Sequence, residues 1–242
     1  MNSEHPEYNR DTNPYPSFGK KYNSERGIIS LTSWKARINT VSKTLFSLIK
    51  QCPGFHIVLV LSEEEFPKMM DELPDNLKLF VDNKLIEILW VYKNYKSFKK
   101  VLFTMDKYRD VPVISADDDC IYTSNYAKEL YNKWSENKNS VITYRKDIAT
   151  GFQNGQATLY PPKTITLNVI GKNFNEILKT KHDDVFIGLI LKNTEIKILE
   201  ISNKLPYEEC KDNEYSLRTE RKLLKLTTNE YINIIKHLMS EK

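Results

Sequence analysis

The chain has 242 residues, and its 36 lysines and arginines against 32 aspartates and glutamates give a formal net charge of +4. This balance lacks the concentrated positive charge of nucleic-acid-binding proteins, so we expect no nucleic acid partner. The three cysteines are odd in number and form no C-x-x-C pair, which argues against a disulfide framework and against a thiolate zinc site.

The beginning of the chain is polar. Residues 1–26 contain several prolines and little apolar periodicity, so they are predicted to form an arm ahead of one domain that spans 27–242. The first ten residues, MNSEHPEYNR, contain no hydrophobic signal region. The longest apolar runs are far shorter than the roughly 18 residues needed to span a bilayer. We therefore expect a cytoplasmic protein.

From Gly27 onward, strand-like and helix-like patterns alternate. The predicted elements of the first half are a strand GIISLTSW (27–34), a helix near 41–49, a strand HIVLVLS (56–62), a strand LIEILWVY (85–92), a helix near 97–108 and a strand VPVIS (111–115). Such alternation predicts an α/β fold with a central, mostly parallel sheet flanked by helices.

The second half is less regular. The predicted elements are a helix (124–137), a strand SVITYR (140–145), an irregular loop (150–165) with two glycines and a Pro-Pro pair, a helix within HDDVFIGLILK (182–192) and a final helix (227–242). Thr227 and Glu230 have the spacing of a capping box at the start of that last helix.

Residues 216–238 mix basic and apolar side chains. That composition suits either peripheral contact with anionic lipid at the inner face of a membrane or a solvated amphipathic helix.

Three aspartates, Asp117, Asp118 and Asp119, follow the apolar strand VPVIS. Side chains alternate along a strand, so an extended backbone would direct Asp117 and Asp119 to one side and Asp118 to the other. In open α/β sheets, ligands bind at the carboxyl ends of the strands. Carboxylates there suit Mg²⁺ or Mn²⁺, which commonly bind through one or two of them together with substrate phosphates. The alternative is that these acids solvate a turn or cap the next helix.

A second acidic pair, Asp183 and Asp184, precedes an apolar stretch of helical length. The free N–H groups and the dipole at a helix N-terminus favour negative charge, so a purely structural role would also explain these residues.

The segments GIISLTSW, ISADDD, GQATLYPP and HDDVFIG resemble, in order and spacing, those of nucleotide-sugar-dependent glycosyltransferases of the GT-A fold, over about positions 27–200. The most specific elements are the D-x-D of Asp117 and Asp119 and the later acidic pair. This resemblance implies a single GT-A domain that moves a sugar, with inversion, from a nucleoside-diphosphate donor to a carbohydrate or lipid-linked glycan acceptor. A UDP-sugar is the favoured donor, and bacterial surface-polysaccharide synthesis is the favoured setting.

The resemblance also implies roles for individual residues. Asp119 would bind Mn²⁺ or Mg²⁺, with Asp117 as a further ligand close to the donor ribose. Asp184 would be the base that deprotonates the acceptor hydroxyl, and Asp183 would orient the acceptor. The remaining donor contacts would be Thr32, Ser33, Arg37, Asp118 in a supporting role, and Lys100 in preference to Lys99. Gly151 and Gly155 would let the loop before LYPP approach a ligand closely, whereas His182 and His237 are left outside the metal site.

Two other functions remain open. A sugar nucleotidyltransferase is disfavoured because no glycine-rich phosphate-binding loop follows the first strand. A non-catalytic sugar-nucleotide-binding protein is disfavoured because the chain retains both the D-x-D and Asp184.

Overall fold

The computed structural model describes residues 15–23, 25–51, 54–147, 150–153, 155–201, 204–210 and 226–240. The described strands are β1 (Ser17–Gly19), β2 (Gly27–Thr32), β3 (Phe55–Ser62), β4 (Glu87–Val91), β5 (Val113–Ser115), β6 (Cys120–Tyr122), β7 (Ser140–Thr143), β8 (Thr158–Tyr160), β9 (Lys197–Glu200) and β10 (Tyr207–Glu209). The described α-helices are α1 (Val41–Ile49), α2 (Asp75–Asp82), α3 (Lys99–Lys107), α4 (Tyr126–Glu136), α5 (Phe174–Thr180), α6 (Asp183–Asn193) and α8 (Thr228–Ser240).

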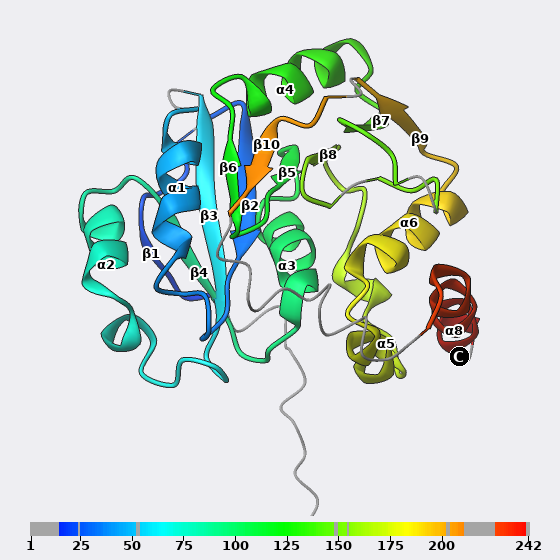
Figure 1. The fold of residues 1–242 in the computed structure, drawn as a ribbon, viewed down its shortest axis with the longest axis horizontal. Helices are drawn as coiled ribbons and strands as arrows, with labels where there is room; N and C mark the ends of the chain where they lie inside the picture. Colours follow the sequence, from blue (N-terminus) through cyan, green and yellow to red (C-terminus); the bar gives the residue numbers. More distant parts are fainter. Residues whose placement is uncertain are drawn as a thin grey trace, which may run out of the picture.

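Eight strands form one mixed sheet in the order β1-β4-β3-β2-β5-β8-β7-β9, and β6 pairs with β10 beside it (Figure 1). Strands β4, β3, β2 and β5 run parallel to one another, and β7 and β9 form a second parallel pair. Strand β1 joins β4 antiparallel, and β8 lies antiparallel to both β5 and β7. The predicted α/β fold, with a mostly parallel sheet flanked by helices, is therefore confirmed.

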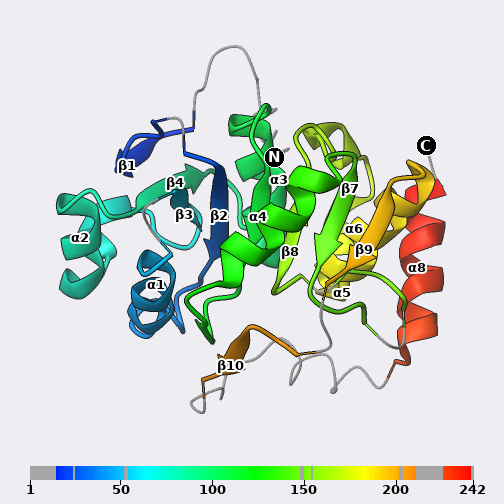
Figure 2. The same ribbon diagram turned by 90° about the horizontal axis from the view of Figure 1, so that it is seen from above.

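Helices cover both faces of the sheet, and each face has its own apolar core (Figures 1 and 2). On one face, apolar side chains of α1, α2 and α4 pack together with Ile57, Leu59 and Trp90. On the other face, α3, α5, α6 and α8 pack together with Val58 and Val60. The inner strands are buried on both sides, which is why they read as continuous apolar runs in the sequence.

The chain joins the sheet earlier than its apolar pattern indicates. Ser17–Gly19 pairs antiparallel with the edge of β4, with Phe18 opposite Ile88. The hydroxyl of Tyr15 donates a hydrogen bond to Asp106 at 2.7 Å. The predicted boundary between arm and domain at residue 27 stays a prediction, but the described end of this arm contributes an edge strand.

The prediction of an irregular loop over 150–165 is wrong at residues 158–160, whereas residues 161–165 contain no strand or helix. Residues 158–160 form β8, which lies between β5 and β7 and places Leu159 opposite both Ile114 and Ile142. A strand of three residues is too short to show the alternation by which strands are recognised, and Pro161 ends it at once.

The C-terminal helix α8 packs against α5 and α6 (Figure 2). The predicted capping box is confirmed: the Thr227 amide donates to the Glu230 carboxylate, and the Glu230 amide donates to the Thr227 hydroxyl. Tyr231 and Ile235 are buried against the protein. Within the described part of the chain, no helix has the length and apolar character needed to cross a membrane.

Candidate functional site

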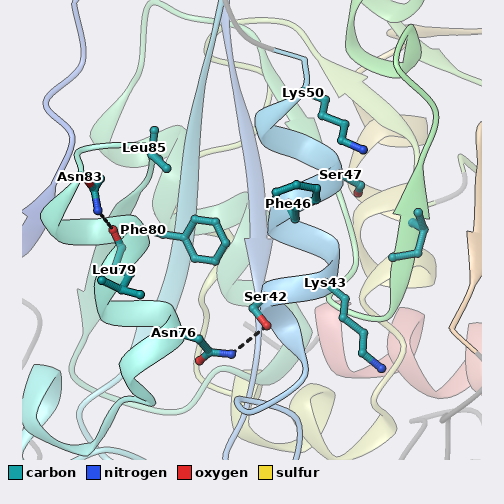
Figure 3. Close-up of a pocket in the computed structure, with 11 residues that line it drawn as sticks. Ser42, Lys43, Phe46, Ser47, Lys50, Asn76, Leu79, Phe80, Asn83 and Leu85 are labelled. Atoms are coloured by element: carbon teal, nitrogen blue, oxygen red, sulfur yellow. Dashed lines mark hydrogen bonds between the residues drawn. The ribbon is translucent and has the colours of Figure 1, made fainter.

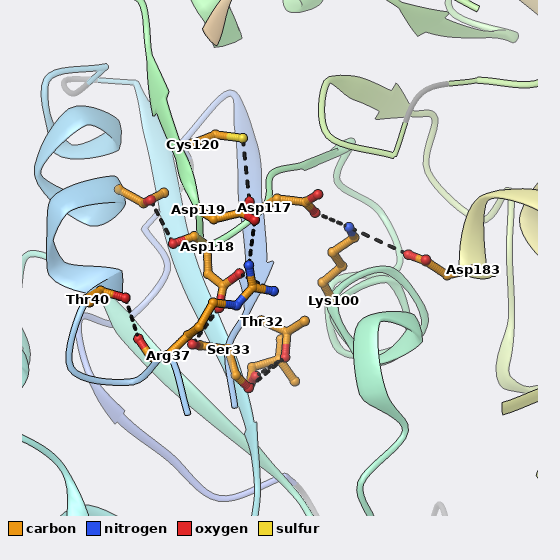
Figure 4. Close-up of polar contacts among 12 residues, drawn as sticks. Thr32, Ser33, Arg37, Thr40, Lys100, Asp117, Asp118, Asp119, Cys120 and Asp183 are labelled. Atoms are coloured by element: carbon orange, nitrogen blue, oxygen red, sulfur yellow. Dashed lines mark hydrogen bonds and ion pairs between the residues drawn. The ribbon is translucent and has the colours of Figure 1, made fainter. Parts of the chain in front are cut away.

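The aspartate triplet lies at the carboxyl edge of the parallel part of the sheet. Strands β2 and β5 are parallel neighbours, so the turn after β2, which carries Arg37, meets the segment after β5. The chain turns at Asp118 and Asp119 before β6 begins. The extended backbone that the alternation of the three side chains requires is therefore absent at the triplet. Asp117 meets Lys100, whereas Asp118 and Asp119 meet Arg37 (Figure 4).

Lys100 lies between the two acidic segments that the sequence singled out. Its Nζ is 2.5 Å from Oδ1 of Asp117 and 3.6 Å from Oδ2 of Asp183, which begins α6. Burial alone would lower the pKa of Lys100, but the charges of Asp117, Asp183 and Asp184 raise it well above its usual value. Burial would raise the pKa of Asp117, but Lys100 and then Arg37 lower it. The ammonium and the Asp117 carboxylate are thus charged at neutral pH.

Arg37 bridges the other two members of the triplet. Its Nη1 is 2.5 Å from Oδ2 of Asp119, and its Nη2 is 3.1 Å from Oδ1 of Asp118. Asp118 also accepts a hydrogen bond from the Ser33 hydroxyl at 2.6 Å, and its main-chain oxygen accepts one from Thr44. Burial raises the pKa of Asp118 to about 6, although Arg37 and Ser33 act in the opposite direction. Asp118 is therefore tied to the strand and helix on either side of Arg37.

Two of the candidate basic and hydroxyl residues make their side-chain contacts outside the triplet. The Thr32 hydroxyl donates to the main-chain oxygen of Val60 at 2.7 Å. Lys99 is buried and pairs with Glu65 at 3.2 Å and with Asn94 at 3.1 Å. Of the two adjacent lysines, Lys100 is the one that reaches the aspartates.

Asp184 lies under a loop formed by residues 150–153 and 155–157, which we call the covering loop. Gly155 approaches Asp184 so closely that a Cβ at this position would overlap Oδ1 of the carboxylate. Gln153 donates to the main-chain oxygen of Asp184 at 3.2 Å. The ring of Phe152 occupies the space that a side chain at Gly188 would need. Gly155 and Gly188 thus permit close approach, whereas a Cβ at Gly151 of the same loop would meet nothing within 4 Å.

Tyrosines that the sequence did not indicate surround these acids. The Tyr122 hydroxyl accepts from the Asp117 amide at 2.8 Å and donates to the main-chain oxygen of Gln156 at 3.0 Å. Tyr160 is fully buried, and burial followed by the charge of Asp184 raises its pKa. No spacing in the sequence distinguishes these tyrosines from ordinary core residues.

The residues present fit a divalent cation in donor chemistry, since carboxylate oxygens are the ligands that Mg²⁺ and Mn²⁺ prefer. Asp117 and Asp119 already pair with Lys100 and Arg37, however, and the described residues contain no group of three His, Cys, Asp or Glu side chains that could hold a metal. The ring of His182 packs against that of Tyr231 of α8, with ring centroids 4.2 Å apart and the ring planes inclined at 53°.

An open groove of about 710 Å³ lies elsewhere, between α1 and α2 (Figure 3). Its lining includes the apolar side chains of Phe46, Leu79 and Leu85 and the lysines Lys43 and Lys50. It contains neither the aspartates nor Arg37 or Lys100, so we do not regard it as the candidate site.

No protein family model matches the chain, and no curated protein matches it. Solved structures do resemble it. The mannosyltransferase PcManGT from Pyrobaculum calidifontis, in complex with GDP-Man and Mn²⁺, has a TM-score of 0.52 at 12% identity, over 94% of this chain and 72% of its own. S. aureus TarS 1–349 in complex with UDP-GlcNAc has a TM-score of 0.59 at 13% identity, over 88% of this chain and 65% of its own.

The same TarS fragment in complex with UDP has a TM-score of 0.54 at 12% identity. This chain spans just under two thirds of the length of that fragment. At such low identity the likeness concerns the fold alone: the chain has an α/β fold that resembles GT-A glycosyltransferases.

Proposed function

We propose that this chain is a glycosyltransferase that moves a sugar, with inversion, from a nucleoside-diphosphate donor to a carbohydrate or lipid-linked glycan acceptor. The observation that supports it most is the position of Lys100, which pairs with the donor-side acid Asp117 and with Asp183 at the start of α6. The buried ammonium of Lys100 thus contacts both acidic segments, of which one would bind the donor and the other the acceptor. The resemblance favours a bacterial surface polysaccharide as the acceptor class.

The donor would lie at the carboxyl edge of β2 and β5, where Arg37 and Lys100 offset the negative charge of the three aspartates beside the diphosphate. GDP-Man and UDP-GlcNAc are bound in the two neighbouring structures, and a UDP-sugar remains the favoured donor of this chain. Mn²⁺ or Mg²⁺ held by Asp119 and Asp117 would neutralise charge on the departing diphosphate.

Asp184 would act as the general base. The acceptor oxygen forms a bond to the anomeric carbon, the bond from that carbon to the diphosphate oxygen breaks, and Asp184 takes the acceptor proton. The nucleoside diphosphate leaves with the electron pair. The contact of Gly155 with Asp184 supports a role for the covering loop in keeping water from the base, which would limit donor hydrolysis.

The substitution Asp184→Asn tests this assignment. The amide cannot accept the proton, so we expect sugar transfer to fall by about 10²-fold or more while donor binding is kept. Transfer is measured as nucleoside diphosphate released from UDP- and GDP-sugars with short polysaccharide acceptors. Asp110→Asn, at an exposed ion pair with Lys163 at 2.8 Å, is the control and should leave transfer unchanged. Unchanged turnover in Asp184→Asn would remove Asp184 from the mechanism.

A further inference from the structure

The guanidinium of Arg37 lies beside the Asp119 carboxylate, in the position that a metal cation bound to this carboxylate would occupy. The ion pair is close, at 2.5 Å from Nη1 to Oδ2, and only 14% of the Arg37 side chain is exposed (Figure 4). Nε of Arg37 is buried and has no hydrogen-bond partner within the described part of the chain. Within the described residues, the polar contacts of this guanidinium are therefore those with the two aspartates.

The two carboxylates that hold Arg37 are not equivalent. Asp118 is 4% exposed and is fixed further by Ser33, whereas Asp119 is 15% exposed. Within the described part of the chain, the Asp119 carboxylate has one further contact, a weak one from the Cys120 thiol at 3.7 Å. A ligand can thus approach Asp119 while the bond between Arg37 and Asp118 persists.

We propose that Arg37 competes with a divalent cation for Asp119, so that the cation binds there only when the guanidinium gives way. The inference deepens the proposed function, because it rests on the metal role of Asp119. A guanidinium and a divalent ion at the same carboxylate would lie within about 4 Å of each other, where like charges repel strongly in a partly solvated site. Arg37 then lowers the affinity of the triplet for metal.

Titration of Mn²⁺ alone into the full chain tests the competition, with free Mn²⁺ followed by electron paramagnetic resonance. Arg37→Met keeps a side chain of similar length and removes the charge, so we expect its dissociation constant for Mn²⁺ to fall at least about tenfold below that of the wild type. Arg37→Lys keeps a positive charge, so its dissociation constant for Mn²⁺ should stay closer to that of the wild type than the constant of Arg37→Met does.

Arg109→Met is the matched control. It removes the same charge from an exposed pair with Asp106 at 3.1 Å, and Mn²⁺ binding should not change. If Arg37→Met fails to fold, as judged by circular dichroism and the melting temperature, Arg37→Gln is measured instead and is expected to behave in the same way. Affinity that is unchanged or weaker in the uncharged variant would overturn the proposal, as would the absence of Mn²⁺ binding in every variant. The titration contains no sugar donor and measures Mn²⁺ binding alone. Either of these results can therefore be told apart from a failure of glycosyl transfer.

Discussion

Lys100 and Arg37 neutralise much of the negative charge of the three adjacent aspartates at the end of a buried strand. Each carboxylate of the triplet has a basic partner within 3.1 Å. Leaving one partner of a buried ion pair alone typically costs about 3–5 kcal/mol. The acids and the bases therefore form one unit.

The sequence located the acids of this unit but not their pairing. Alternation along an extended strand places Asp118 on the opposite side from Asp117 and Asp119. The backbone turns at Asp118, so this alternation does not apply. Arg37 and Asp119 are 82 positions apart, and only the parallel pairing of β2 with β5 brings them together. The roles of these residues in binding and catalysis stay predictions.

Gly155→Ala tests the contact between the covering loop and Asp184. The added methyl group would overlap the carboxylate, so the loop or the side chain must move. We expect transfer to fall at least about tenfold and the free energy of unfolding to fall by about 1–3 kcal/mol, as for other forced close contacts.

Gly171→Ala is the control for this substitution, since an added Cβ there would meet nothing within 4 Å. Its unfolding free energy and activity should match those of the wild type. Equal behaviour of the two variants in urea unfolding and in the transfer assay would show that Asp184 does not depend on the covering loop.

Length alone does not decide which elements are predictable, because the sequence did not indicate the eight-residue helix α2 but did indicate the three-residue strand β5. Helix α1 and strand β3 have nine and eight residues, so their apolar periodicity is evident in the sequence. The sequence pattern gave no indication of α5 or of β8. The position of β8 results from antiparallel pairing with two distant strands, which no local pattern encodes.

The docking of α8 gives an element-scale prediction. Ile235 is 0% exposed and Ile234 is 38% exposed, although they are adjacent. Ile235→Ala should lower the free energy of unfolding by about 2–4 kcal/mol through the cavity that it leaves. Ile234→Ala should lower it by less than about 1 kcal/mol. Urea unfolding measures both, and equal effects would contradict the packing of α8 through Ile235.

At the scale of the whole molecule, the sheet carries a second polar cluster at the end opposite the candidate site. Glu87, the first residue of β4, accepts hydrogen bonds from Lys107 at 2.5 Å and from Tyr108, and it bonds His56 at 2.6 Å. Tyr22 packs edge-on against His56, with ring centroids 5.7 Å apart. This cluster therefore ties the segment before β2 to the parallel strands.

Glu87 should make the stability of the fold depend on pH. Burial would raise the pKa of Glu87, but the bonds from His56, Lys107 and Tyr108 lower it from 4.5 to about 2. Because the pKa of Glu87 is lower in the folded than in the unfolded protein, its charge stabilises the fold at pH values above the unfolded-state pKa. This stabilisation is lost as the pH falls from about 4.5 towards 2. A shift of this size corresponds to about 3 kcal/mol.

Urea unfolding of the wild type and of Glu87→Gln between pH 7 and pH 2 measures this contribution. The difference between the two free energies of unfolding should be about 3 kcal/mol at pH 7 and should shrink below pH 4.5. A difference that stays constant over this range would show that the Glu87 charge does not stabilise the fold.

The central claim is that the carboxyl edge of β2 and β5 binds a sugar nucleotide with the help of a divalent cation. Calorimetric titration of UDP-, GDP- and CMP-sugars, with and without Mn²⁺, tests it most directly in the wild type and in Asp119→Ala. We predict that a sugar nucleotide, with a UDP-sugar favoured, binds the wild type more tightly with Mn²⁺. Asp119→Ala should lose this gain while keeping the melting temperature of the wild type. If no sugar nucleotide binds, or if Asp119→Ala keeps the full gain from Mn²⁺, the claim is contradicted.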